Sequence, residues 1–248
     1  MVPFMTLVIS QTPSFADTID IVVYCNMSIR SLLLLTLKLD TKHSSRVKRE
    51  TKKQLKHDAI LKVSEDLMLK NGLHSLNMND VAREANLAKG TLYLYFGSRE
   101  EIIGALALKA RIMLLNIFKQ NIFGNKSSIE KLKGIVLANY TFLKQNKLYY
   151  ELVSFYEIIE RETETPEMQS VIKEITELIV SIIEQGKSKN EIKKSIDPAI
   201  LSFSMWGMTV GIMQLIKSKS EAIRAHPGLT EDKIIEEYIS VFISGIKK

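Results

Sequence analysis

Cysteine is nearly absent from this chain of 248 residues, which contains only Cys25. A single thiol excludes an internal disulfide framework and a cysteine-rich zinc site, and it fits a reducing cytoplasm. Proline and glycine are also scarce, with 5 and 11 residues, which suits long helices better than a fold with many tight turns. The four histidines are scattered without metal-ligand spacing, so we predict neither a metal site nor a cofactor.

Local signatures of catalysis are missing as well. Gly186-Lys187-Ser188 resembles the end of a phosphate-binding loop, but Ser181 occupies the place of the required glycine, and no strand pattern precedes it. Neither a Gly-x-Ser-x-Gly nor a His-Glu-x-x-His motif occurs in the sequence. We therefore predict no catalytic residues and a protein that is not an enzyme.

Positive charge is concentrated in one short segment. Residues 42–62 carry eight basic and two acidic residues, so their net charge of +6 equals that of the whole chain. Residues 112–248 hold 18 basic and 17 acidic residues and are nearly neutral. A basic block beside a neutral body indicates contact with a polyanion such as nucleic acid. A solvated basic arm is the alternative.

The first 46 residues differ from the rest in composition. Charged residues at positions 17, 20, 30 and 38 interrupt the apolar stretches, so no span of about 20 apolar residues exists for a membrane helix. Residues 1–16 contain no basic residue, which a secretory signal requires before its apolar core. We predict that residues 1–47 form a poorly ordered extension or lie upstream of a true start near Val47. We expect no membrane association; a weak membrane-surface anchor is the alternative.

The segment after the basic block shows the spacing of three helices. Apolar residues at helical spacing predict a helix over 52–71, which Gly72 ends. A short helix over 78–85, capped by Asn77, precedes the turn 86–88 and a third helix over 89–96. Asn86 tolerates the left-handed backbone that such a turn often needs. Two short helices joined by three residues match the helix-turn-helix plan, in which the second helix enters the major groove of DNA.

The segment 77–103, NMNDVAREANLAKGTLYLYFGSREEII, resembles the DNA-binding signature of the TetR family of bacterial and archaeal repressors. The matches fall in order at Val81-Ala82, Ala85, Lys89–Tyr93, Tyr95-Phe96, Ser98 and Glu100. The resemblance implies an all-α protein with an N-terminal three-helix helix-turn-helix DNA-binding domain over 48–111. A helical-bundle domain for ligand binding and dimerisation over 112–248 would follow.

Three positions depart from the family pattern. Asn86 replaces the usual turn glycine, which is a conservative change in backbone terms. Ala88 replaces the usual capping serine, so the third helix loses a capping hydroxyl. Leu94 stands where a polar residue is usual, and a leucine can contact a thymine methyl group but cannot bond a phosphate.

The predicted DNA contacts combine the resemblance with position on the helix. Side chains at the start of the third helix reach base edges, and Gly90 lets the backbone approach the groove closely. The predicted DNA-binding residues are Asn77, Lys89, Gly90, Thr91, Tyr93, Tyr95 and Arg99. Lys52 and Lys53 are expected to act as an electrostatic arm rather than as base readers. Tyr95, like Leu92 and Phe96, has a place in the small core as its alternative.

Helical spacing continues after Ser98. The sequence predicts helices over 99–120, 128–146, 147–164, 166–186, 197–218 and 230–247, with proline or glycine near their boundaries. By resemblance, the last two long helices, over about 198–216 and 230–246, form the homodimer interface. The interface candidates are Leu201, Met205, Met208, Ile212, Ile239, Phe242 and Ile243, with ordinary core within one subunit as the alternative for each.

A ligand pocket is expected between the middle helices. The predicted ligand-binding residues are Met113, Tyr140, Tyr149, Phe155, Tyr156, Phe203 and Trp206, each of which has the core as its alternative. Glu157 and Glu160 lie near this aromatic stretch, and a buried carboxylate there would favour a cationic ligand, although an exposed helix face is the commoner explanation.

The sequence as a whole predicts a cytoplasmic homodimeric repressor, released from a palindromic double-stranded DNA operator by an unidentified small molecule. Two alternatives remain open at this point. One is a ligand-independent architectural or cell-cycle DNA-binding factor. The other is a helical binding module in which the helix-turn-helix is only structural.

Overall fold

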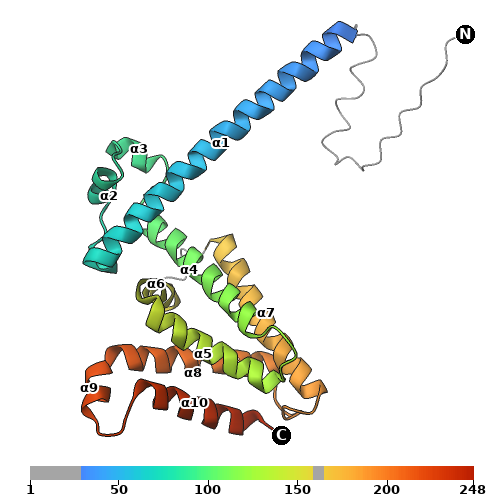
Figure 1. Ribbon diagram of the computed structural model, residues 1–248, viewed down its shortest axis with the longest axis vertical. Helices are drawn as coiled ribbons and strands as arrows, with labels where there is room; N and C mark the ends of the chain where they lie inside the picture. Colours follow the sequence, from blue (N-terminus) through green and yellow to red (C-terminus); the bar gives the residue numbers. More distant parts are fainter. Residues whose placement is uncertain (1–28, 159–164) are drawn as a thin grey trace, which may run out of the picture. The chain divides into compact units, whose positions relative to one another are not determined.

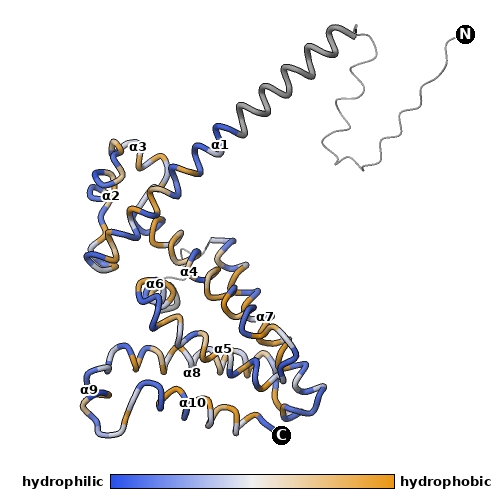
Figure 2. Tube along the Cα trace, in the orientation of Figure 1, coloured by the Kyte–Doolittle hydropathy of each residue, from blue (hydrophilic) through white to orange (hydrophobic). Residues whose placement is uncertain are grey.

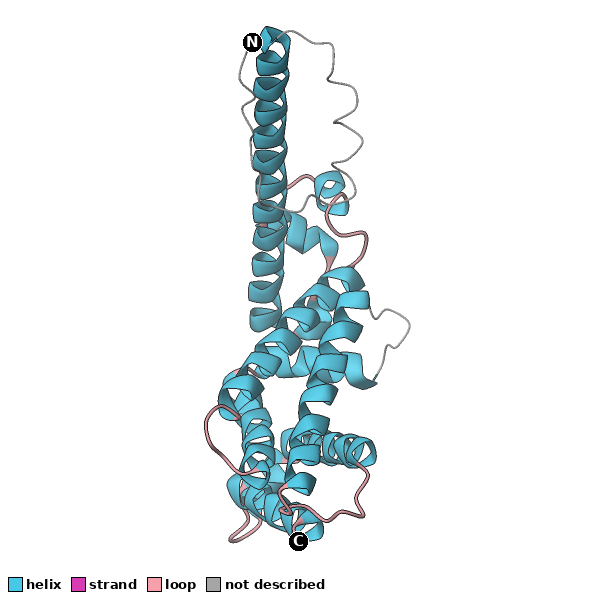
Figure 3. Ribbon diagram, turned by 90° about the vertical axis from the view of Figure 1, so that its right-hand side faces the viewer, coloured by secondary structure: helices cyan, strands magenta, loops and turns pink. Residues whose placement is uncertain are grey.

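The computed structural model describes the backbone of residues 29–158 and 165–248 and the side chains of residues 48–155 and 165–248. Cys25 lies outside the described residues. Every element named in the described part is a helix, and the β-pairing there is one isolated antiparallel bridge between Ile192 and Lys247, so the all-α prediction is confirmed (Figures 1 and 3). The first elements are α1 (Ile29–Asn71), the short 3-10 helix η2 (Leu73–Ser75), α2 (Met78–Glu84), α3 (Lys89–Tyr93) and α4 (Arg99–Asn121). The later ones are α5 (Ser128–Gln145), α6 (Lys147–Ile158), α7 (Pro166–Ser188), α8 (Pro198–Ser218), α9 (Ser220–Ala225) and α10 (Glu231–Ile246).

The chain divides into two compact units, Met1–Lys56 and His57–Lys248. The described part of the first unit is the N-terminal portion of α1, and all later helices belong to the second unit. The boundary predicted between residues 111 and 112 falls inside α4. The division into DNA-binding and ligand-binding domains therefore stays a prediction.

Helix α1 begins at Ile29, much earlier than the predicted start at 52, in a stretch for which the sequence predicted a poorly ordered extension. Residues 29–71 contain neither proline nor glycine and are rich in leucine and lysine, which favour helix. The helix ends as predicted at Gly72, whose φ of 89° lies in the left-handed region that glycine adopts readily.

The helix-turn-helix forms with the predicted local chemistry. The Asn77 side chain caps α2 by accepting a hydrogen bond from the Asp80 backbone N–H over 2.9 Å. Asn86 adopts a positive φ of 53° in the turn, as predicted. Ala88 occupies the N-cap position before α3, which therefore has no side-chain cap. Helix α3 ends at Tyr93, three residues before the predicted end.

Two clusters of buried apolar side chains form the core of the second unit. The first contains Ile60, Leu92 and Ile102 from the helix-turn-helix region together with Leu152 of α6 and Met168 of α7. The second joins residues of every helix from α4 to α10, and apolar stretches alternate with hydrophilic ones along these helices (Figure 2). Helix α4 contributes to both clusters, so one continuous helix connects the DNA-binding motif to the body.

The helices of the body follow the predicted spacing closely. Asp197 caps α8 through its carboxylate and Pro198 opens that helix, as their order in the sequence suggests. Helix α6 is described as far as Ile158, and the rest of its predicted range, 159–164, lies outside the described residues. The short helix α9 was not predicted.

Helix α8 is the one described helix that is long and apolar enough to cross a membrane by length and composition. Its mean hydropathy over 18 residues is 1.6, and 33% of that window is buried within the protomer. Buried and exposed residues alternate along it: Leu201, Met205 and Thr209 are buried, whereas Phe203 and Met208 are exposed. The exposed apolar side of α8 therefore needs a physical explanation.

Candidate DNA interface and ligand cavity

Helix α3 exposes most of the residues that the sequence assigns to DNA. Leu92 is fully buried and anchors the helix, while Lys89, Gly90 and Tyr93 are exposed. The Lys89 Nζ atom lies 6.0 Å from the centroid of the Tyr93 ring, one helical turn away. A Cβ built on Gly90 would meet no atom within 4 Å. The start of α3 thus presents a cation and a phenol beside an open stretch of backbone, which suits close approach to a groove.

Leu94 follows α3 directly and is 80% exposed. An apolar side chain is thus almost fully exposed next to Tyr93 in the sequence, so packing within the protomer does not explain why the residue is a leucine. A thymine methyl group in the major groove is a chemically matched contact for such a leucine.

Thr91 and Tyr95 are half-buried. The Tyr95 side chain packs against the first apolar cluster, together with the buried Phe96. The alternative stated for Tyr95, a place in the small core, therefore holds for the buried part of its side chain. Its DNA contact stays a prediction.

Asn77 is exposed at the start of α2 and has a second partner besides the Asp80 backbone N–H. Its amide nitrogen donates to the Asp80 carboxylate, which also pairs with Arg83 at 2.6 Å. Asn77 therefore orients the N-terminus of α2, where backbone N–H groups favour an anion such as a phosphate.

Arg99 opens α4, where Ser98 caps the helix by accepting from the Glu101 backbone N–H over 3.1 Å. Its Nη2 atom donates to the Leu73 carbonyl and its Nη1 atom donates to the Glu100 carboxylate, both over 3.3 Å. Arg99 thus ties η2 to the start of α4. Because a guanidinium has five N–H donors, these two bonds leave capacity for the predicted phosphate contact.

Lys52 and Lys53 are exposed residues of α1 in the first unit. Their predicted role as an electrostatic arm is not tested by the geometry of the second unit.

The missing cap of α3 gives a direct stability prediction. We expect Ala88→Ser to raise the free energy of unfolding by about 1 kcal/mol, because serine accepts a hydrogen bond from a free N–H in the first turn. Urea denaturation followed by circular dichroism measures this change. Ala59→Ser, at an exposed position inside α1, is the matched control. It is expected to lower the free energy of unfolding by about 0.5 kcal/mol, because serine favours helix less than alanine does. A loss of stability in Ala88→Ser would contradict the capping argument.

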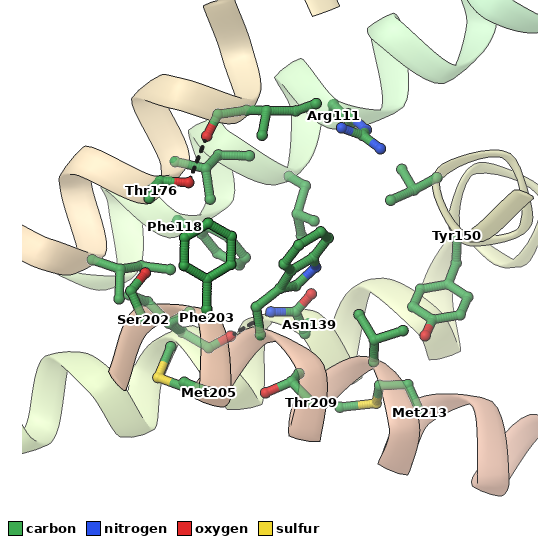
Figure 4. A pocket seen from close by; sticks show the side chains of 18 residues that line it. Arg111, Phe118, Asn139, Tyr150, Thr176, Ser202, Phe203, Met205, Thr209 and Met213 are labelled. Carbon is green, nitrogen blue, oxygen red and sulfur yellow. Dashed lines mark hydrogen bonds between the residues drawn. The ribbon is translucent and has the colours of Figure 1, made fainter. Parts of the chain in front are cut away.

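A cavity of about 130 Å³ lies between α4, α5, α6, α7 and α8 (Figure 4). Its lining is mostly apolar and includes Phe118, Ile135, Ile175, Met205 and Met213. Such a concave, apolar space with few polar groups is typical of a small-molecule site.

The structure places the predicted ligand-binding residues in different surroundings. Phe203 and Trp206 line the cavity, with ring centroids 6.2 Å apart. Met113, Tyr140, Tyr149 and Phe155 are not among its lining residues. The Tyr156 side chain, like that of Glu157, and Glu160 lie outside the described residues. A ligand role for each of these residues stays a prediction.

Three of the aromatic candidates have other partners. The Tyr140 hydroxyl donates to the Asp232 carboxylate over 2.7 Å, and burial together with this bond raises the pKa of Tyr140. The Phe155 ring lies 6.0 Å from the His74 ring, centroid to centroid. Tyr149 contacts Lys109, whose Nζ atom lies 5.1 Å from the centroid of its ring. These three side chains pack between helices and do not line the cavity. Aromatic character alone was therefore not enough to identify the residues that line it.

Arg111 is a cavity residue that sequence reasoning missed. It is only 4% exposed, and it is the single charged residue among the described residues that line the cavity. A signal was present in the sequence, because Arg111 shares its helix face with the apolar residues Ala107, Leu114 and Phe118. A lone arginine on an apolar helix face indicates either a buried partner or a ligand contact.

Glu65 of α1 and Lys109 of α4 form an ion pair, and Lys109 is close in sequence to a residue that lines the cavity. The Lys109 Nζ atom lies 2.9 Å from the Glu65 Oε2 atom, and Glu65 is only 8% exposed. Burial alone would raise the pKa of Glu65, but hydrogen bonds with Lys109 and Tyr149 and the positive charge of Lys109 lower it below its usual value. Lys109 is two residues from Arg111, and Tyr149 is adjacent to Tyr150, which lines the cavity. Helices α4 and α6 therefore contact both the end of α1 and the cavity.

Comparison with known proteins agrees with this geometry. Residues 60–106 match the family model described as bacterial regulatory proteins, tetR family. The HTH-type transcriptional regulator UidR of Escherichia coli (strain K12) is 24% identical over 180 residues, covering 71% of this chain and 89% of UidR. The HTH-type transcriptional repressor KstR2 of Mycolicibacterium smegmatis is 20% identical over 196 residues, covering 77% of this chain and 90% of KstR2.

A solved structure shows the same fold. FadR from Bacillus subtilis, a transcriptional regulator crystallised in complex with stearoyl-CoA, superposes with a TM-score of 0.58 at 18% identity, covering 76% of this chain and 98% of FadR. The family model covers the helix-turn-helix, whereas the alignments to whole regulators continue through the helical body. The helix-turn-helix region therefore matches the tetR family of bacterial regulatory proteins, and the relatives whose alignments extend beyond it are transcriptional regulators.

Proposed function

We propose that this protein is a homodimeric repressor that binds a palindromic DNA operator and is released by a small molecule. The observation that carries the proposal is the exposed start of α3, where Lys89, Gly90 and Tyr93 face solvent on a helix-turn-helix. Two such helices related by a two-fold axis would read two half-sites of the operator. Residues 48–111 would form the DNA-binding domain, and residues 112–248 the ligand-binding and dimerisation domain.

The cavity supports the ligand-responsive part of the proposal. Helix α4 begins at Arg99, beside the DNA-binding motif, and contributes Phe118, near its other end, to the cavity lining. A ligand that fits one arrangement of α4 better than another would shift the population of protomers toward that arrangement. The coupling requires different ligand affinities for the DNA-binding and released states.

Fluorescence anisotropy with DNA from just upstream of the gene tests the proposed activity. We expect tight binding to this DNA, weak binding to a scrambled duplex, and an affinity that falls steeply as salt rises. Equal weak binding to both duplexes and to a panel of genomic fragments would contradict a sequence-specific repressor. Specific binding that no small molecule reverses would favour the ligand-independent alternative.

The exposed side of α8 supports dimerisation. Its exposed apolar residues recur at helical spacing along one side: Ile200, Phe203, Met208 and Leu215. Gly207 and Gly211 lie on the same side, and a Cβ on either would meet no atom within 4 Å. A continuous apolar side with small residues at its centre fits close packing against another helix.

The interface candidates from the sequence divide into two groups. Leu201, Met205, Phe242 and Ile243 are buried within one protomer, which was their stated alternative. Met208 is exposed, and Ile212 and Ile239 are half-buried. Helix α10 adds the exposed Val241, so α8 and α10 together offer the proposed interface.

We expect Met208→Glu to shift the protein from dimer to monomer and to weaken operator binding by at least about tenfold, because a buried unpaired carboxylate opposes association. Sedimentation velocity measures the oligomeric state. Leu137→Glu is the matched control, since Leu137 is a similarly exposed apolar residue on α5. A wild-type protein that is monomeric and floats with lipid vesicles would instead assign the apolar side of α8 to a membrane.

We place the protein in the cytoplasm, where DNA is accessible to it, and regard it as a regulator rather than an enzyme. The named relatives support this assignment because each is a transcriptional regulator or repressor.

A further inference from the structure

The opening of the cavity carries an inference that rests on the proposed dimer and makes the ligand site more specific. We propose that a second copy of this chain covers the opening, so that an apolar ligand is enclosed in the dimer but contacts water in a single protomer. Three features support this assignment: the position of the opening, the apolar surface beside it and the lack of charge along most of α8.

The cavity opens between α7 and α8. Among the described residues that line it, Phe203 and Trp206 are the two exposed ones, at 60% and 44%, and both belong to α8. Ile172, Ile175 and Thr176 line the cavity from α7 and are half-buried. The lining residues of α4 and α6 are all buried. Figure 4 shows Phe203 extending from α8 toward α7, so its ring and that of Trp206 mark the opening.

Two aromatic rings at the opening are incompletely buried in one protomer. Their centroids are 6.2 Å apart, so they form one apolar surface. Full burial of a large apolar side chain is favourable by about 1.5–3 kcal/mol relative to exposure. A cover over the opening would remove Phe203, Trp206 and a bound ligand from water together, and this burial favours association.

The apolar surface continues from the opening along the exposed side of α8. Ile200 lies three residues before Phe203, and Gly207, Gly211 and Leu215 follow at intervals of four, so these residues share one side of the helix. A Cβ on either glycine would meet no atom within 4 Å, which leaves room for another helix. A helix that packs against this side would therefore also lie beside the opening.

The charge pattern of α8 favours a second copy as the partner. Residues 198–216 contain no charged residue. In a two-fold dimer a surface meets a copy of itself, so like charges there would repel each other. A side without charge avoids this repulsion, and it also lacks the complementary charges that steer a different protein to its partner. The surface is continuous with the interface proposed on α8 and α10.

The polar side chains of the cavity are largely occupied within the protein, so the ligand we expect is apolar. Asn139 donates to the Ile135 carbonyl over 3.2 Å, and the Thr209 hydroxyl lies 2.9 Å from the Tyr238 hydroxyl. The cavity of one protomer measures about 130 Å³, and a longer ligand can extend through the opening toward the second copy. Because enclosure needs both copies, ligand binding and dimerisation strengthen each other by the same factor.

Trp206 reports directly on the opening, because it is the single tryptophan of the chain. Acrylamide quenching of the full chain without DNA is measured over a range of protein concentrations, and sedimentation velocity assigns monomer and dimer. We expect quenching to fall at least about twofold when the dimer forms, with emission shifting to shorter wavelength, because the indole ring leaves water. Free N-acetyltryptophanamide is the reference for full exposure.

A neutral apolar dye, N-phenyl-1-naphthylamine, tests the ligand site itself, since its fluorescence rises in apolar surroundings. We expect it to bind the dimer at least about tenfold more tightly than the monomer. Met208→Glu provides the monomer, because Met208 is exposed on α8 and is not a lining residue. Leu137→Glu on α5 is the control and should remain dimeric and bind the dye like the wild type.

Three results would overturn the inference: a wild-type dimer in which Trp206 stays as accessible as in one protomer, equal dye binding by monomer and dimer, or a chain that is monomeric at every concentration. Quenching of the wild-type dimer needs no variant, so the test holds even if Met208→Glu fails to fold. Because no DNA is present, a failure of operator binding appears separately. A dimer with an accessible Trp206 would remove the covered opening and leave the repressor proposal standing.

Discussion

The double variant Lys89→Ala, Tyr93→Phe is expected to bind the operator at least about 100-fold more weakly than the wild type, since each good base or phosphate contact contributes about 1–3 kcal/mol. Lys89 and Tyr93 lie one turn apart on the exposed side of α3, and neither belongs to the buried core. Their replacement should therefore leave the fold intact. Fluorescence anisotropy with operator DNA measures the affinity, and circular dichroism verifies the helix content.

The single variants divide this effect into its parts. If Lys89 neutralises a phosphate, Lys89→Ala should reduce the slope of log affinity against log salt by about one. If it reads a base, the slope should stay constant while discrimination between operator variants falls. Lys133→Ala removes an exposed lysine of α5 and serves as the control. Wild-type affinity in the double variant would favour the alternative in which the helix-turn-helix is only structural.

A second large effect is expected from Lys109→Met, which should lower the free energy of unfolding by about 2 kcal/mol. Loss of one partner from a buried ion pair costs about 3–5 kcal/mol, and the partial exposure of Lys109, 47% of its side chain, reduces that figure. The cost arises because the Glu65 carboxylate stays buried without its closest cation. Urea denaturation measures the change.

A double-mutant cycle with Glu65→Gln isolates the pair. We expect the two single variants to lose more stability in sum than the double variant loses, because the neutral amide no longer needs a cation. Additive losses would show that Glu65 and Lys109 stabilise the fold independently of each other. Lys119→Met is the control, since Lys119 pairs with the exposed Glu174 on the surface and should cost less than about 1 kcal/mol.

The pH dependence of stability follows from the direction of the Glu65 pKa. The folded state lowers this pKa below its usual value, so the unfolded chain takes up the proton first as the pH falls. The stabilisation is fully present above the unfolded pKa of about 4.3 and is lost as the pH falls through the lowered folded value. Glu65→Gln should lack this part of the acid dependence, and this comparison completes the test of the ion pair.

The helix-turn-helix was predictable because its signals are local. Asn77 caps the following helix through a bond to a residue three positions away, and Asn86 adopts a backbone conformation that its own side chain tolerates. Helix boundaries in the body were also set locally, as at Asp197 and Pro198. Each of these features depends on neighbours in sequence, so a single sequence contains enough information to predict it.

The start of α1 and the short helix α9 were predicted less well, because the local signals there are weak. Helix α1 extends to Ile29 because nothing in its sequence interrupts it, although its mixed leucine and charge pattern suggested poor order. The short helix α9 has no side-chain cap at its start, and it follows α8 after a single residue. Its existence depends on the burial of Ile223 in the second cluster, which is a long-range contact.

The cavity was the least predictable feature. Aromatic residues were chosen by size, but their roles depend on which helix each one faces after packing. Tyr140 faces α10 through Asp232, and Tyr149 faces the end of α1. Arg111 carried a readable signal in its apolar surroundings, but its position in a cavity wall depends on α7 and α8, which lie far away in the sequence.

The exposed apolar side of α8 has a consequence for the lifetime of the protein in a cell. If a protomer gains part of its stability from a second copy, its folded fraction rises with its own concentration, and so does its melting temperature. Newly made chains at low copy number would then be degraded faster than chains in an abundant population. Abundance itself would become a regulated quantity, with a threshold set by the side of the helix that contains Ile200, Met208 and Leu215.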